Sequence, residues 1–310
     1  MKRRYSFDSS VFSRPFSMPV AASVLALAVA LSMLPTGAVA DEVKLDAGAV
    51  ADKIAAAWYA QCIGNTYGLG HEHRYRKDPR TKPIEGYEQR ILDRLKGANG
   101  CFSDDDTDIE YVYLHAMEKY GIVPTLEHLG IMWKKHINRK IWVANEAART
   151  LMARGWLPPQ SGERGRNRHW SKIDPQLVNE IWAMTSPAMV DYAADMADWA
   201  AHVTNDDWGT HATMWYNAMY AAAFTETDAE KLYRIGMNQL PVDSPMRQCL
   251  ADILAWHKEH PDDWVAVRRA VDKKWYKRPH SSGVGSVINA AMGAIAMLYG
   301  EGDFRKTLDL

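Results

Sequence analysis

The sequence predicts an all-α protein, and three observations lead to this prediction. Apolar residues recur at intervals of three and four along most of the chain, which places them on one face of a helix. Glycine and proline fall mostly between these apolar segments, and no stretch alternates long enough to indicate a strand. Because no Pro/Gly/Ser-rich linker divides the chain after residue 40, we expect one helical domain over residues 41–310.

Residues 1–40 have the layout of a secretory signal peptide. Three basic residues at positions 2–4 precede an uncharged apolar stretch, Val20–Leu34, and a small-residue cleavage site ends at Ala40. The alternative is an uncleaved anchor, but a spanning helix needs about 20 apolar residues and this stretch is shorter. We therefore expect export to the periplasm or the medium, with no membrane attachment after cleavage.

The charge of the remaining chain argues against a nucleic-acid partner. The whole sequence has 37 Lys and Arg against 38 Asp and Glu, and cleavage removes four bases and one acid, which leaves a net charge of −4. Nucleic-acid binding calls for a basic stripe. The oligomeric state is not indicated.

Three cysteines, Cys62, Cys101 and Cys249, leave at least one thiol unpaired in an exported protein. Their spacing does not resemble a zinc site. A Cys62–Cys101 disulfide and buried inert thiols both remain open.

The elements expected in order are helices near 47–62, 85–96, 107–120, 125–135, 140–153, 175–184, 187–203, 211–224, 227–238, 244–259, 263–276 and 285–299. In Asp108–Tyr120, for example, Ile109, Val112 and Ala116 share one face, and Gly121 then ends the helix. The Ala- and Gly-rich segments 187–203 and 285–299 allow close helix packing and are predicted to form the centre of the bundle. The polar stretches 70–83 and 158–171 are expected to be loops, either carrying ligand contacts or mobile at the surface.

The acidic run Asp104–Asp108, followed by Glu110, is the strongest chemical feature. These carboxylates repel one another, so folding them together costs free energy unless a positive charge is bound. One interpretation is a solvated helix N-cap, since the helix dipole favours acids there. The other is a site for a hard cation such as Mg²⁺, Mn²⁺ or Ca²⁺, which prefers oxygen ligands.

Two further segments have ordinary structural interpretations when taken alone. Gly64–Glu72 reads as a glycine C-cap that leads into a loop, although this does not account for Glu72. Asp198–Gly209 joins two helices, where Asn205 and Asp206 are good capping and turn residues.

Taken together and in order, these segments resemble the ADP-ribosylglycohydrolase family, which includes the enzyme that reactivates dinitrogenase reductase. Gly64–Glu72 fits the family frame Gly-Asp-Ala-x-Gly-x-x-x-Glu, and Asp104–Thr107 fits Thr/Ser-Asp-Asp-Thr at a helix start. The later segments that fit are Asp191–Ala197, Val203–Thr204, Met219–Phe224 and Asn289–Phe304. The resemblance covers nearly the whole region after residue 40.

The resemblance implies a single-domain orthogonal helical bundle with a two-magnesium centre. The activity it implies is hydrolysis of the N-glycosidic bond of a small-molecule or protein-linked ADP-ribosyl substrate. Carried over by position, Asp104, Asp105 and Asp106 would be metal ligands, and Glu72 and Asp105 the catalytic residues. Asn205 and Asp206 would contact substrate.

The chain also departs from the family pattern. Asn65 and Asn205 replace the usual Asp and His, and the family's second metal motif would follow a stretch like Phe304–Leu310, where this sequence ends. We expect either a fragment of an enzyme or a protein without half of its metal ligands. The alternative function is therefore a degenerate binding or structural protein on the same fold. A carbohydrate-binding module, suggested by twelve Trp residues, is a further alternative. Against it, five of them fall within predicted helices, where packing is their common role: Trp133, Trp142, Trp182, Trp199 and Trp215.

Overall fold

The computed structural model describes residues 43–82, 84–100, 102–280 and 282–310. Residues 45–310 form one compact unit. The predicted signal peptide and Cys101 lie outside the described residues, so neither the cleavage site nor the Cys62–Cys101 disulfide is tested.

The described residues form α-helices joined by turns, which confirms the all-α prediction, and they contain a single isolated β-bridge, between Lys172 and Gly285. The first half comprises α2 (Ala47–Leu69), α3 (Gln89–Gly97), α4 (Asp105–Tyr120), α5 (Leu126–His136), α6 (Val143–Ala153), the 3-10 helix η1 (Asp174–Leu177), α7 (Ile181–Met184) and α8 (Val190–Ala201). The second half comprises η2 (Asp207–Thr210), α9 (His211–Ala222), α10 (Ala229–Gln239), α11 (Pro245–Glu259), α12 (Trp264–Trp275), α13 (Ser286–Gly300) and α14 (Phe304–Asp309).

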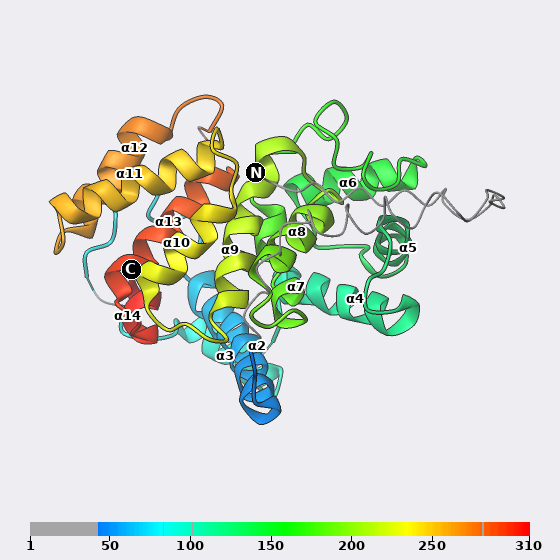
Figure 1. Cartoon of the computed structure of the whole chain (residues 1–310), viewed down its shortest axis with the longest axis horizontal. Helices are drawn as coiled ribbons and strands as arrows, with labels where there is room; N and C mark the ends of the chain where they lie inside the picture. The colour runs from blue at the N-terminus through cyan, green and yellow to red at the C-terminus, as the bar shows by residue number, and fades with distance from the viewer. Residues whose placement is uncertain (1–42, 83, 101, 281) are drawn as a thin grey trace, which may run out of the picture. The chain divides into compact units, whose positions relative to one another are not determined.

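Helix α9 lies between α8 and α10 and packs against both (Figure 1), so it connects two apolar clusters. One cluster is formed by α4 to α8 around the fully buried Trp133 and Trp182, and the other by α9 to α13 around Trp215 and Tyr233. Helix α8 packs along α9 through buried alanines, and α13 is buried along most of its length, as their composition predicted. Small side chains allow this close approach, so the middle of the bundle is compact.

Four expectations were wrong in detail. Helix α2 continues to Leu69 rather than ending near residue 62, so Gly64 and Gly68 lie inside it and Gly70 is its C-cap. The expected helix 175–184 is divided into η1 and α7. Helix α14 was not predicted. Trp142, expected within a helix, precedes α6 and is 53% exposed.

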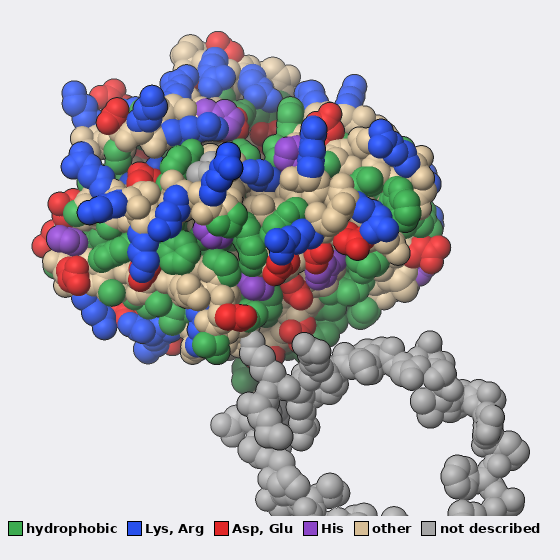
Figure 2. Space-filling view, turned by 90° about the horizontal axis from the view of Figure 1, so that it is seen from above, with side chains coloured by type: hydrophobic (Ala, Val, Ile, Leu, Met, Phe, Trp, Pro, Cys, Tyr) green, Lys and Arg blue, Asp and Glu red, His purple; other side chains and the backbone are tan. Residues whose placement is uncertain are grey.

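The surface carries both signs of charge. On the face in Figure 2, Lys and Arg side chains are distributed with Asp and Glu side chains between them. None of the described helices has the length and apolar character needed to cross a membrane. Cys249 is fully buried, and burial raises the pKa of its thiol far above the usual range.

Candidate functional site

The acidic run begins helix α4, as predicted. Asp104 is the N-cap, and its carboxylate accepts a hydrogen bond from the Asp105 backbone N–H at 3.0 Å. Asp105 and Asp106 occupy the first turn and are half-buried, whereas Asp108 is exposed. The next residue of the run, Thr107, is 8% exposed and its hydroxyl has no hydrogen-bond partner among the described residues.

The carboxylates at this helix start are poorly compensated. Burial, followed by the charge of Asp104, raises the pKa of Asp105 to about 7. Burial, followed by the charges of Asp105 and Glu180, raises the pKa of Asp106 to about 8. Because burial and repulsion outweigh the stabilising helix dipole, a cation placed here would lower the free energy of the ionised carboxylates.

The segment Gly64–Glu72, which includes the end of α2, lies against the acidic run. The Asn65 side-chain amide donates to Asp106 Oδ2 at 3.3 Å. Glu72 follows the end of α2 in a turn, with its side chain 61% exposed and its Oε1 3.1 Å from His73 Nε2. The charge of Glu72 contributes to the raised pKa of Asp106. The structure therefore brings Glu72 and Asn65 to the same end of α4.

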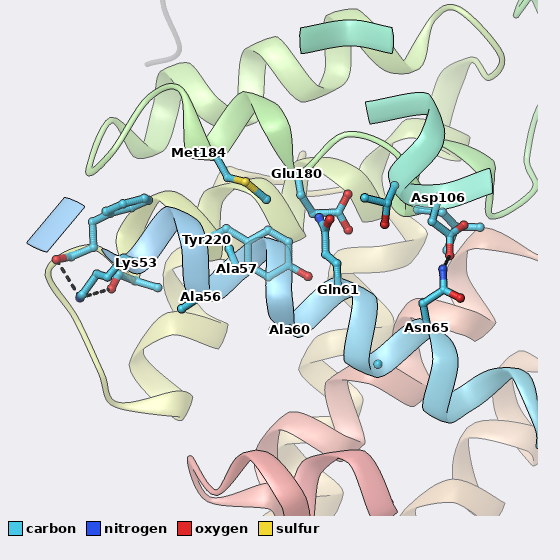
Figure 3. A pocket seen from close by; sticks show the side chains of 15 residues that line it. Lys53, Ala56, Ala57, Ala60, Gln61, Asn65, Asp106, Glu180, Met184 and Tyr220 are labelled. Carbon is cyan, nitrogen blue, oxygen red and sulfur yellow. Dashed lines mark hydrogen bonds between the residues drawn. The ribbon is translucent and has the colours of Figure 1, made fainter. Parts of the chain in front are cut away.

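A cavity of about 630 Å³ extends from this end of α4 along α2 (Figure 3). Asp106, Thr107 and Asn65 line one end, and Lys53 and Phe224 line the other. Glu180, which immediately precedes α7, points into the cavity between these ends.

Behind Glu180 lies a buried acid that the sequence analysis did not assign to the site. Glu110 on α4 is 0% exposed and is hydrogen-bonded to Glu180. Its oxygens also accept from Gln61 Nε2 at 2.9 Å and from the Ile181 backbone N–H at 2.7 Å. Burial raises the pKa of Glu110 to about 7, and burial together with the charge of Glu110 raises that of Glu180 well above its ordinary value. Such a pair is stable when the two carboxyl groups share a proton.

The sequence pattern indicates that both Glu110 and Glu180 are buried acids. Glu110 is three and seven residues before Tyr113 and Met117, so it belongs to the buried face of α4 rather than to the solvated acidic turn. Glu180 is a lone charge within the apolar stretch 177–184. A single acid on an apolar face indicates a buried acid with a partner.

Asn205 and Asp206 have structural contacts and do not line this cavity. Asn205 is fully buried and its side-chain amide donates to the Lys172 carbonyl at 2.7 Å. Asp206 caps η2 and accepts from the Arg164 backbone N–H at 2.9 Å. These contacts support the capping interpretation, and the predicted substrate contacts of both residues stay predictions.

The carboxylate oxygens at the start of α4 fit a magnesium ion in their chemical type and in their charge. Within the described part of the chain, no three His, Cys, Asp or Glu side chains are grouped so that they could hold a metal ion. Mg²⁺, however, usually keeps several waters and takes only one or two carboxylates from the protein, with substrate oxygens completing its shell. Asp105 and Asp106, which are half-buried and repel one another, provide such carboxylates.

The structure is an all-α bundle in which adjacent aspartates begin one helix, beside a glycine-containing helix and a cavity. These features define a class of helical proteins with an acidic site. A family model described as ADP-ribosylglycohydrolase matches residues 46–310, so the chain belongs to that family. No curated protein and no solved structure matches it.

Proposed function

We propose that the protein is an exported, magnesium-dependent hydrolase of an N-glycosidic bond to ADP-ribose or a related ribosyl group. Membership of the family supports hydrolysis of an ADP-ribosyl-type substrate. The observation that carries the proposal is the pair Asp105 and Asp106, half-buried and uncompensated where α4 borders the cavity.

In this proposal, Asp105 and Asp106 hold Mg²⁺, and Asp104, whose carboxylate caps α4, adds negative charge beside them. The ion would supply orientation of the ribose hydroxyls and activation of water. Asn65 holds Asp106 in place through its amide. Glu72, whose side chain is exposed beside this end of α4, positions the attacking water and accepts its proton.

The test is release of ADP-ribose from an ADP-ribosylated arginine substrate, measured by chromatography with Mg²⁺ and with EDTA. We expect Glu72→Gln to lower kcat by about 10²–10⁴-fold, the range for loss of a general base. Asp105→Asn removes a metal ligand and should abolish turnover together with Mg²⁺ binding measured by calorimetry.

Asp108→Asn is the matched control because Asp108 lies in the same first turn but is exposed. It should keep wild-type activity. Equal activity of the Asp105→Asn and wild-type proteins would contradict the proposed metal site.

One observation favours a second candidate, a binding protein without catalysis. The family frame has Asp where this chain has Asn65, and here the amide of Asn65 occupies a position beside Asp106 where a second carboxylate would otherwise face it. In this case ADP-ribose would bind, with a dissociation constant measurable by calorimetry, but no glycosidic substrate would be cleaved.

A further inference from the structure

The middle of the cavity differs chemically from the aspartate end. Alanines at positions 56, 57 and 60 of α2 form one wall, and Leu177, Met184 and Phe224 form others. Figure 3 shows Tyr220 extending from α9 with its hydroxyl toward Gln61 and Glu180. The Tyr220 side chain is 38% exposed, so its surface is open to an occupant of the cavity.

Three side chains bring hydrogen-bond acceptors to this apolar space. The carboxyl of Glu180 lines it and is bonded to Glu110 and to the Asn179 backbone N–H, at 3.0 Å in the latter case. The Gln61 amide nitrogen is engaged with Glu110, and its oxygen Oε1 is buried without a hydrogen-bond partner among the described residues. Thr107, which is more than nine-tenths buried, also leaves its hydroxyl unpartnered at the cavity wall.

The described residues provide little positive charge to this space. Lys53 is the one base among the lining residues, and its ammonium donates to the carbonyls of Ala223 at 2.8 Å and Phe224 at 3.1 Å. These bonds hold it at the end of the cavity away from Asp106 (Figure 3). The one base that lines the cavity is therefore bonded to backbone carbonyls and does not neutralise Glu180 and Glu110.

We propose that this cavity binds an organic cation, a primary ammonium group carried on an apolar body. The ammonium has three N–H donors and no acceptor, which matches Glu180 and Gln61 Oε1. The body packs against the alanines and Met184, and the Tyr220 ring adds a cation–π surface. The cavity volume falls in the usual range for small-molecule sites. The proposal does not depend on glycoside hydrolysis.

The test compares three probes of nearly equal shape, 4-phenylbutylammonium, 4-phenylbutan-1-ol and 4-phenylbutanoate, by calorimetry on the full chain at pH 7.5. We expect the ammonium to bind at least about tenfold more tightly than the alcohol, because it gains a hydrogen bond between charged groups. The carboxylate has no hydrogen-bond donor to offer Glu180 and Gln61 Oε1, so it should show no binding.

Two variants and one control locate the site. Glu180→Gln keeps the side-chain shape and should remove the preference for ammonium while leaving the alcohol's affinity unchanged. Ala60→Phe fills the cavity from α2 and should abolish binding of both probes, whereas Glu118→Gln, on an exposed side chain of α4, should change nothing. Near-UV circular dichroism checks that each variant is folded.

Equal affinity for ammonium and alcohol would overturn the proposal, as would an ammonium preference that survives Glu180→Gln. Absence of binding by all three probes to the wild-type protein would overturn it as well. None of these results affects the hydrolysis assay, whose variants and substrate are different, so failure of the cation site and failure of the proposed activity are separable.

Discussion

At the scale of single residues, the main feature of this protein is the number of acids whose pKa is raised. Burial is the first cause for Asp105, Asp106, Glu110 and Asp174, and nearby carboxylates add to it for the first two. A carboxyl with a raised pKa binds its proton more tightly in the folded state than in the unfolded state. Its contribution to stability is therefore present at low pH and is lost as the pH rises through the folded-state value.

Glu110 allows a direct test of this residue-scale effect. Its pKa is raised from 4.5 to about 7, so the wild-type free energy of unfolding should fall between about pH 4.5 and pH 7. A glutamine at position 110 cannot ionise. In the Glu110→Gln variant, the free energy of unfolding should therefore fall less over this pH range, by roughly 1–3 kcal/mol. Urea denaturation at pH 5, 6, 7 and 8 measures the slope. Parallel curves for Glu110→Gln and wild type would show that Glu110 does not titrate in this range.

At the scale of elements, the polar loop 158–171 is more firmly held than its sequence indicated. Asn167 is fully buried, and its side-chain amide donates to the carbonyls of Ala144, Ser161 and Thr204 at 2.9–3.1 Å. The Ser161 hydroxyl donates to the Val203 carbonyl at 2.7 Å. These bonds join the loop to the start of α6 and to the turn after α8. The loop is therefore packed against the bundle, which is contrary to the alternative of a mobile surface loop.

Gly162 tests how closely this loop packs. A Cβ on Gly162 would lie 2.5 Å from the His202 carbonyl oxygen and 2.7 Å from that of Asn205, so backbone would have to shift. We expect Gly162→Ala to lower the free energy of unfolding by about 1–3 kcal/mol, the usual cost of overpacking.

Gly165→Ala is the control in the same loop, because a Cβ there meets nothing within 4 Å. It should leave the urea midpoint nearly unchanged. Equal midpoints for Gly162→Ala and Gly165→Ala would mean that the loop is not packed against the turn after α8.

At the scale of the whole molecule, packing of α8 on α9 joins the two apolar clusters into one compact unit over residues 45–310. Helix α4, which begins with the acidic run, packs into one cluster, and the cavity draws its walls from α2, α4, α7 and α9. Residues from distant parts of the chain therefore have to assemble before the site exists. A substitution that weakens the packing of α8 on α9 is expected to disturb the site even though the substituted residue does not line it.

Export is a prediction about the whole chain. Expression of the full sequence in a bacterial host should yield a processed protein whose first residue is Asp41, which follows the small-residue site ending at Ala40. N-terminal sequencing of the periplasmic and medium fractions measures this. Ala40→Leu should block processing, and an unprocessed wild-type protein in the cell pellet would contradict export with cleavage.

The sequence by itself determined most of the helices and the place of the acidic run. Periodicity and capping are local properties, so α4 to α6 and α9 to α13 lie within a few residues of their predicted bounds. The N-cap role of Asp104 also follows from local chemistry. The prediction was wrong where local signals were weak, as at Gly64 and Gly68, which α2 accommodates instead of ending.

Only the tertiary structure decided which polar side chains meet. The contacts of Asn65 with Asp106 and of Gln61 with Glu110 join positions more than forty residues apart, and Glu110 accepts from the Ile181 N–H about seventy residues away. No periodic pattern encodes such pairs, because they depend on how α2, α4 and α7 pack together. The acidic run could therefore be recognised from sequence as a candidate site, whereas the buried pair of Glu110 and Glu180 behind the cavity emerged from the packing.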